Sequence, residues 1–180
     1  MEKVVLNNVQ LDYLAFNHPQ LGKHYEGARA CDTLPATISK EGNKAFIVNT
    51  DPQSKPGRHW IALWIDGDTC ELLDSFSLSL KVYPDSGPLQ QWLKRHFKEI
   101  VMNSESLQAF NSDSCGDYAL MYLIDKSNGR SMNYFLDRFK TNNFVWNDHH
   151  VGQMLKHYIN SFSTKTWKDV SDKHHRQRNK

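Results

Sequence analysis

A cysteine stands at the boundary between a polar segment and an apolar one. Cys115 and Gly116 follow a polar run that ends at Ser114, and the residues from Tyr118 to Ile124 are almost all apolar. A segment that is apolar on every side is typical of a helix buried inside a domain. In the first turn of such a helix, free N–H groups and the positive end of the helix dipole favour the thiolate over the thiol. The sequence therefore predicts that Cys115 is a nucleophile at the start of a buried helix.

A nucleophilic thiol needs a base, and the base needs a group that orients it. His59 and Trp60 open an apolar run, Asp66 and Gly67 form a strong turn signal, and a second apolar run ends at Asp74. Two such runs joined by an Asp-Gly pair are typical of a β-hairpin. Antiparallel strands bring the two ends of a hairpin together. We therefore expect Asp74 to hold the His59 imidazole and to stabilise its protonated form.

The order of these residues resembles the adenain family of adenovirus-type cysteine proteases, whose wider clan includes the proteases that remove SUMO-like modifiers. The similarity covers residues 44–123 and includes Gln108, seven residues before Cys115. The resemblance implies that His59 is the general base and Cys115 the nucleophile. It further implies that Asp74 orients the base and that Gln108 is the oxyanion donor. Adenovirus enzymes carry Glu at the position of Asp74, whereas Asp is usual elsewhere in the clan.

The resemblance implies a cysteine endopeptidase that cleaves viral or virus-like precursor proteins during capsid or core maturation, in the host nucleus or in the virion. An isopeptidase that removes a ubiquitin-like or SUMO-type modifier is the alternative, because it would use the same residues. A catalytically inactive interaction module is a further alternative. Residues 25–35 are also similar, more loosely, to proteases of virus-like DNA transposons and fish viruses.

Trp60 and Gly116, the neighbours of the base and the nucleophile, are the candidate substrate-binding residues. A core position would explain Trp60 equally well. The resemblance implies a tight cleft that prefers glycine close to the scissile bond, because related enzymes thread an extended peptide between close walls. If Asp74 proved unnecessary, Asp66 and Glu71 would be the nearest acids in sequence to take its place.

The remaining cysteines and histidines offer no second site. Cys70 lies in an apolar run and is expected to be buried, while Cys31 is expected to be a free thiol. An odd count of three cysteines argues against a disulfide scaffold and indicates a reducing compartment. The spacing of Cys and His residues predicts no metal site, and the chemistry requires no cofactor. No apolar run approaches the ~20 residues that span a bilayer, and no signal peptide is recognised.

Composition and spacing indicate a single globular α+β domain, expected to be a monomer. The chain has 180 residues, of which 39% are hydrophobic and 23% charged. Apolar spacing predicts helices over 8–16, 89–100, 115–124, 132–140 and 147–162, strands over 45–49, 60–65, 71–74 and 107–110, and a polar loop over 17–35. Ser131 and Asn147 are the expected N-caps of the last two helices. The resemblance implies a papain-like or adenain-like fold, with a central mixed sheet flanked by helices.

The chain divides into a protease domain over 1–162 and a basic tail over 163–180. The tail has six basic and two acidic residues, a net charge of +4, which leaves −2 for the first 162 residues of a chain whose total is +2. The tail is either an ordinary solvated terminus or a DNA-binding segment. Its candidate contacts are Lys165, Lys168, Lys173, Arg176, Arg178 and Lys180.

Possible activators follow from the resemblance, because adenovirus enzymes use viral DNA and a disulfide-linked viral peptide. Residues 72–108 contain no cysteine. A peptide activator of this protein is therefore expected to bind non-covalently, or to be absent.

Overall fold

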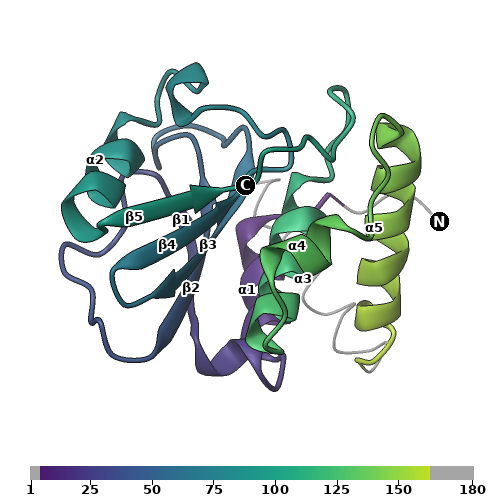
Figure 1. Ribbon diagram of the computed structural model, residues 1–180, viewed down its shortest axis with the longest axis horizontal. Helices are drawn as coiled ribbons and strands as arrows, with labels where there is room; N and C mark the ends of the chain where they lie inside the picture. The colour runs from purple at the N-terminus through teal and green to yellow at the C-terminus, as the bar shows by residue number, and fades with distance from the viewer. Residues whose placement is uncertain (1–4, 163–180) are drawn as a thin grey trace, which may run out of the picture.

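The computed structural model describes residues 5–162 and is built around a five-stranded mixed β-sheet (Figure 1). The strands lie in chain order across the sheet: β1 Tyr25–Ala30, β2 Asn43–Asn49, β3 Trp60–Asp66, β4 Thr69–Leu73 and β5 Glu99–Met102. β2, β3 and β4 are antiparallel neighbours, whereas β1 runs parallel to β2 and β5 parallel to β4. Among residues 5–162, no helix is long and apolar enough to cross a membrane.

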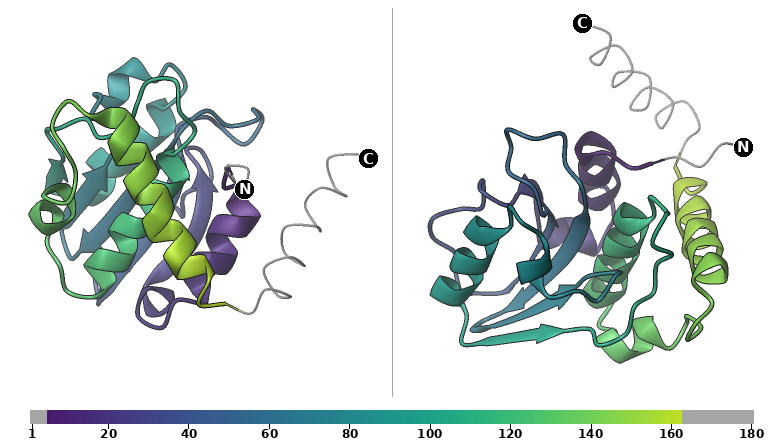
Figure 2. Two further views of the ribbon diagram at one scale, coloured as in Figure 1. Left: turned by 90° about the vertical axis from the view of Figure 1, so that its right-hand side faces the viewer. Right: turned by 90° about the horizontal axis from the view of Figure 1, so that it is seen from above.

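Helices cover both faces of this sheet. They are α1 Asn8–Phe16, α2 Gly87–His96, α3 Cys115–Ser127, α4 Met132–Leu136 and α5 Phe144–Ile159, with short 3-10 helices η1 Leu21–Lys23 and η2 Leu80–Val82. α2 packs on one face, and α3 lies against the other (Figure 1). Both views of Figure 2 place α5 on the outer side of α3. The order of layers is therefore α2, sheet, α3 and α5.

The central strands are mainly apolar because both of their faces are covered. On β2, Phe46 and Val48 join the cluster beside α2, while Ala45 and Ile47 join the cluster beside α3. Side chains alternate between the two faces of a strand, so one continuous apolar run supplies both clusters.

The predicted buried helix is confirmed as α3, which is buried from Gly116 to Asp125. Its two tyrosines fix the helix to the layers on either side. The Tyr118 hydroxyl donates to Asp148 Oδ1 of α5 at 2.9 Å, and the Tyr122 hydroxyl donates to Glu71 Oε2 of β4 at 2.6 Å. This anchoring holds the start of α3, and thus Cys115, in a defined position.

The three predicted central strands and the first helix are confirmed, but two predictions around β5 are wrong. The helix expected over 89–100 ends at His96, and Ile100 belongs to β5. Apolar spacing failed here because β5 is a short edge strand whose side chains are largely exposed. The strand expected over 107–110 is a loop. The backbone N–H groups of Leu107 and Gln108 both donate to the carbonyl oxygen of Ser75, at 2.8 and 3.0 Å. Two successive N–H groups that share one acceptor do not form the regular hydrogen-bond ladder of a β-sheet.

Three other boundaries differ from the sequence prediction. The expected polar loop over 17–35 contains β1, which pairs with β2 at the sheet edge and has an irregular register. Ser131 caps α4 as predicted, but the helix ends at Leu136 rather than Lys140. α5 begins at Phe144 and is capped by Asn143, whose side chain accepts from the Trp146 N–H. Asn147 lies inside α5, where its buried amide donates to the carbonyls of Leu107 and Lys140.

Candidate active site

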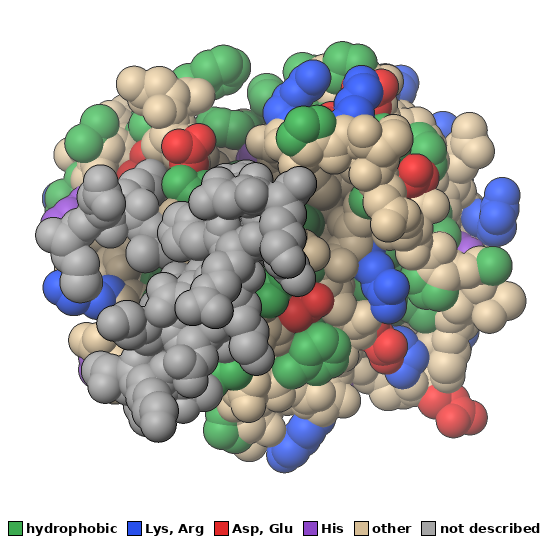
Figure 3. Space-filling view, turned by 180° about the vertical axis from the view of Figure 1, so that it is seen from behind, with side chains coloured by type: hydrophobic (Ala, Val, Ile, Leu, Met, Phe, Trp, Pro, Cys, Tyr) green, Lys and Arg blue, Asp and Glu red, His purple; other side chains and the backbone are tan. Residues whose placement is uncertain are grey.

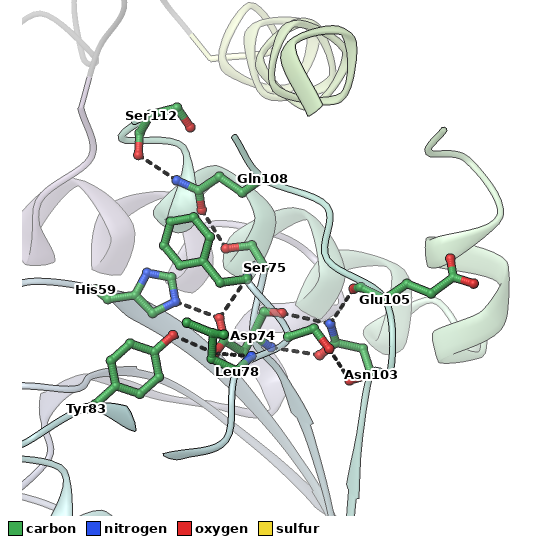
Figure 4. A network of polar contacts seen from close by, with 11 residues as sticks. His59, Asp74, Ser75, Leu78, Tyr83, Asn103, Glu105, Gln108 and Ser112 are labelled. Atoms are coloured by element: carbon green, nitrogen blue, oxygen red, sulfur yellow. Dashed lines mark hydrogen bonds and ion pairs between the residues drawn. The ribbon is translucent and has the colours of Figure 1, made fainter. Parts of the chain in front are cut away.

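The β3–β4 hairpin brings a histidine and an aspartate together. His59 directly precedes β3 and Asp74 directly follows β4, so both lie at the same end of the sheet. His59 Nε2 lies 2.7 Å from Asp74 Oδ1 (Figure 4). The side chains are 3% and 0% exposed, so this contact is shielded from water. Asp74 is therefore placed to hold the imidazole in one orientation.

Asp74 accepts hydrogen bonds on both carboxylate oxygens. The Phe76 N–H donates to Oδ1 at 2.9 Å, while the Tyr83 hydroxyl and the Leu78 N–H donate to Oδ2 at 2.6 and 3.3 Å. Burial by itself would raise the pKa of the Asp74 carboxyl. The hydrogen bond and charge of His59, and then the donors from Tyr83 and Phe76, hold this pKa below its usual value. Asp74 is thus a charged acceptor.

Asn103 fixes the backbone of Asp74, a role that the sequence gave no reason to expect. Its Oδ1 accepts from the Asp74 N–H at 2.9 Å, and its Nδ2 donates to the Asp74 carbonyl at 2.7 Å. Asn103 directly follows β5, which is parallel to β4. The position of Asn103 directly after a strand that pairs with β4 could have indicated this role. Sequence reasoning did not find it, because β5 itself was not predicted.

Two aromatic rings enclose the imidazole. Phe76 stacks on His59 with ring centroids 4.8 Å apart, and Tyr83 stacks at 5.3 Å with an interplanar angle of 14°. These rings restrict rotation of the imidazole and exclude water from its faces. Sequence reasoning missed both residues, although Phe76 lies only two positions after Asp74.

The Cys115 thiol completes a chain of contacts from the carboxylate to the sulfur. Cys115 is the first residue of α3, has a free thiol and is partly exposed. His59 bonds to Asp74, and the Cys115 thiol lies close enough to the imidazole to raise its pKa. Because Asp74 takes Nε2, the remaining ring nitrogen, Nδ1, is the one available to the thiol.

The pKa of His59 reflects these contacts. Burial alone would lower the pKa of His59, but the hydrogen bond to Asp74 and the interaction with Cys115, together with the charges of both groups, raise this pKa to about 9. The imidazolium is therefore the favoured form at neutral pH. A protonated base between a carboxylate and a thiol can later deliver its proton to a leaving group.

Gln108 lies in the loop before α3 with its amide oriented by neighbours on both sides. Its Oε1 accepts from the Ser75 hydroxyl at 2.6 Å, and its Nε2 donates to the Ser112 carbonyl at 2.7 Å (Figure 4). The side chain is 2% exposed. An amide nitrogen carries two N–H bonds, so a second one remains after the bond to Ser112. Such an oriented donor can bind a developing oxyanion.

Trp60 is partly buried and packs against the core on the α3 side of the sheet. It also lies beside the first turn of α3, since a methyl group replacing the Gly116 hydrogen would lie 3.6 Å from Trp60 Cδ1. The structure therefore brings Trp60 and Gly116 together beside the thiol.

The other candidate residues lie away from this site. Asp66 is at the turn end of β3, and Glu71 contacts Lys126 through an ion pair of 2.8 Å. Burial raises the pKa of the Cys31 thiol to about 11, with the charges of nearby acids adding to this effect. Burial also raises the pKa of Cys70 far above its usual value. Both thiols thus favour the unreactive form.

Within residues 5–162, no group of three His, Cys, Asp or Glu side chains is arranged to hold a metal ion. The tail candidates lie outside the described residues. They are Lys165, Lys168, Lys173, Arg176, Arg178 and Lys180.

A mixed sheet with a cysteine at the start of a buried helix and a His–Asp pair at the neighbouring strand ends defines the papain-like, adenain-like class of fold. The crystal structure of the African swine fever virus protease shows the same fold, with a TM-score of 0.56 and 15% sequence identity. The match covers 82% of this chain and 67% of that chain. The predicted fold class is confirmed.

The relatives found by sequence are viral cysteine proteases. The cysteine protease of African swine fever virus is 23% identical over 133 residues, or 67% of this chain and 48% of that protein. The protease of bovine adenovirus C serotype 10 is 31% identical over 103 residues, or 50% of this chain and 52% of that protein. One further relative, from another isolate of the swine fever virus, is named a SUMO-1 cysteine protease.

These relatives confirm the resemblance to adenain-like proteases that the sequence showed. The chain spans about half the length of the curated relatives it matches. No protein-family model matches the chain.

Proposed function

We propose that this protein is a cysteine endopeptidase that cleaves viral or virus-like precursor proteins. The observation that carries the proposal is the buried His59–Asp74 bond beside Cys115, which starts α3 and raises the pKa of the His59 imidazole. The viral protease relatives support the same chemistry. The burial and hydrogen bonding of this triad argue against an inactive interaction module, which would have no need of an oriented base.

The chemistry proceeds in two halves. The Cys115 thiolate attacks the scissile carbonyl carbon, and the oxygen becomes an anion that the Gln108 amide and the Cys115 backbone N–H stabilise. The His59 imidazolium gives its proton to the departing amine, which leaves an acyl thioester. The neutral imidazole then takes a proton from water, and the hydroxide attacks the thioester, which releases the acid and regenerates the Cys115 thiolate beside the His59 imidazolium. Asp74 keeps the ring in place throughout.

The cleavage of a precursor protein is tested by comparing wild type with Cys115→Ala. We expect the variant to lose cleavage of co-expressed capsid and core precursors while keeping its thermal unfolding midpoint, because the thiol is partly exposed and contributes little packing. Cys31→Ser serves as the control and should retain cleavage, since this thiol lies outside the site. Full activity of Cys115→Ala would overturn the proposal. Sequencing the new termini would also show whether glycine is preferred before the cut.

A SUMO-type isopeptidase is the second candidate, favoured by the relative that is named a SUMO-1 cysteine protease. Peptide and isopeptide carbonyls present the same chemistry to the thiolate, so the site itself fits both. Rapid cleavage of a reporter carrying the C-terminus of a ubiquitin-like protein, with no cleavage of capsid precursors, would replace the first proposal with this one.

The proposed function includes a location, beside viral DNA, and two possible activators, DNA and a peptide. Action in the host nucleus or virion would place the enzyme beside packaged DNA, and the basic tail over 163–180 is the segment suited to contact it. A peptide activator, where one exists, would act without a disulfide, because residues 72–108 offer no cysteine.

A further inference from the structure

A large aromatic side chain, Phe110, is exposed in the loop that connects Gln108 to Cys115 in the sequence. Phe110 is 86% exposed, the highest value among the exposed large apolar side chains of residues 5–162. Single exposed apolar side chains are common on protein surfaces, so exposure alone indicates little. Phe110 differs because of the neighbours that it contacts.

Phe110 is connected to the catalytic base through one intervening ring. Its ring centroid lies 5.5 Å from that of Phe76, and Phe76 in turn stacks on His59 at 4.8 Å. The two phenylalanines therefore form an aromatic surface that begins at the face of the imidazole and extends into solvent. We call this pair the Phe76–Phe110 surface.

A turn holds Phe110 in this position. The Ser112 N–H donates to the Ala109 carbonyl at 3.1 Å, so Phe110 is the second residue of a β-turn. The closing residue is fixed as well, because the Ser112 carbonyl accepts from Gln108 Nε2 at 2.7 Å. At the start of the turn, the Ala109 N–H donates to Asp148 Oδ2 of α5 at 3.3 Å. The exposed ring is thus presented by an anchored loop.

The position of the base determines which part of a substrate lies beside this surface. In the proposed mechanism, His59 gives its proton to the amine of the residue that follows the scissile bond. That nitrogen must come within hydrogen-bond reach of the ring. The side chain of the same residue is then carried next to the rings that flank His59. Tyr83 also stacks on His59, but its hydroxyl is occupied by Asp74.

We propose that the Phe76–Phe110 surface binds the side chain of the residue immediately after the scissile bond and favours an apolar residue there. The inference rests on the proposed protease function and adds a specificity determinant on the leaving-group side. An apolar side chain gains by covering exposed aromatic carbon, whereas glycine offers nothing to cover it.

The preference can be read directly from cleavage products. A library of peptides from a digested proteome is incubated with the full-length protein, and each new amino terminus identifies the residue after a cut. Wild type should enrich Leu, Met and Phe at this position. Phe110→Ala should lose the enrichment, and its kcat/KM for a leucine peptide should fall about tenfold relative to the matched glycine peptide. Phe110→Leu should retain most of the preference.

A second measurement isolates the leaving-group side. Added amino acid amides compete with water for the acyl thioester, and the amine that attacks must occupy the same place as the departing one. Leucinamide should therefore compete better than glycinamide with wild type, and this advantage should disappear in Phe110→Ala. Tyr134→Ala is the control, because Tyr134 is an exposed aromatic on α4, with Arg130 and Arg138 over its ring.

The outcomes separate the two proposals. If wild type cleaves peptides and Phe110→Ala keeps the apolar preference, this inference is wrong and the protease function stands. The inference is also wrong, and the protease function also stands, if wild type shows no preference for an apolar residue immediately after the scissile bond. If wild type cleaves neither library peptides nor precursor proteins, both proposals fall together.

Discussion

Asp74 and Ser75 are neighbours in the chain but serve different parts of the site. Asp74 turns toward the imidazole, whereas the Ser75 hydroxyl donates to Gln108 Oε1 and the Ser75 carbonyl accepts from the Gln108 N–H at 3.0 Å. Asp74 and Ser75 therefore position both the proposed base, His59, and the proposed oxyanion donor, Gln108. Because the Ser75 hydroxyl donates to Gln108 Oε1, the amide nitrogen Nε2 points away from Ser75.

Ser75 is expected to act through Gln108. Loss of one neutral hydrogen bond is worth roughly 1 kcal/mol, so Ser75→Ala should lower kcat about fivefold to tenfold with little change in KM. Gln108→Ala should lower kcat by roughly a hundredfold or more, as expected for a lost oxyanion donor. Adding Ser75→Ala to Gln108→Ala should then have almost no further effect.

The control for this cycle is Ser127→Ala, which removes a partly buried hydroxyl at the far end of α3, one that donates to the Ile124 carbonyl at 2.8 Å. This variant should lower stability while kcat stays within about twofold of wild type. Additive effects of Ser75→Ala and Gln108→Ala would contradict the positioning role.

The pH dependence of activity reports the His59 pKa. The His59 imidazolium persists until the pH reaches its raised pKa of about 9, so kcat/KM should fall as the pH rises through that value. Asp74→Asn removes the negative charge that raises this pKa and replaces the charged acceptor with a weaker, neutral one. The alkaline limb of the profile should therefore move to lower pH, with partial activity remaining.

Asp66→Asn is the matched control, since Asp66 is exposed at the turn end of β3 and should leave the profile unchanged. An Asp74→Asn profile that overlays the wild-type profile would show that another group sets the His59 pKa.

At the scale of elements, the sequence predicted the parts with strong local patterns. The β3–β4 hairpin follows from an Asp-Gly turn between apolar runs, and α3 follows from an apolar stretch after Cys115. Asn103 and the rings around His59 were not predictable in this way. Their positions depend on β5, a short exposed edge strand, and on the loop over 75–86, whose fold is set by contacts distant in sequence.

The loop between β2 and β3 carries His59, and one glycine controls its shape. Gly57 has a φ of +93°, and a Cβ there would lie 2.7 Å from Asn49 Nδ2. Asn49 closes the loop by accepting from the N–H groups of Asp51 and Arg58 at 3.0 and 3.1 Å. A side chain at position 57 would therefore displace the segment just before His59.

Gly57→Ala is expected to cost roughly 1–2 kcal/mol of unfolding free energy from backbone strain. It should also reduce kcat by more than about tenfold, because small displacements of a catalytic group are costly. Gly42→Ala separates the two effects. Gly42 also has a positive φ, of +67°, but a Cβ there meets nothing within 4 Å. This variant should lose similar stability and keep its kcat. Equal kcat values for both variants would show that the loop tolerates the displacement.

At the scale of the whole molecule, charge distinguishes the folded part from the tail. The formal charge of residues 1–162 is −2, against +4 for residues 163–180. On the face shown in Figure 3, the described Lys and Arg side chains are interspersed with Asp and Glu. A surface with mixed charges offers little attraction to a polyanion. An interaction with DNA would therefore depend on the tail.

The tail prediction compares the full chain with one ending at Phe162, which keeps the contacts of the Phe162 ring with Tyr13 and Tyr158. If the six basic tail residues contact phosphates, the full chain should bind DNA more tightly and without base preference. The logarithm of its affinity should fall with the logarithm of salt concentration by about 0.9 per phosphate neutralised.

Cleavage by the full chain should be stimulated by DNA at low salt, in the presence or absence of reducing agent. The shortened chain should show the same basal cleavage without stimulation, because the triad lies wholly within the described residues. Equal DNA affinity and equal stimulation of the two chains across a salt series would show that the tail is an ordinary solvated terminus. The catalytic proposal would then stand without it, since His59, Asp74 and Cys115 all lie within residues 5–162.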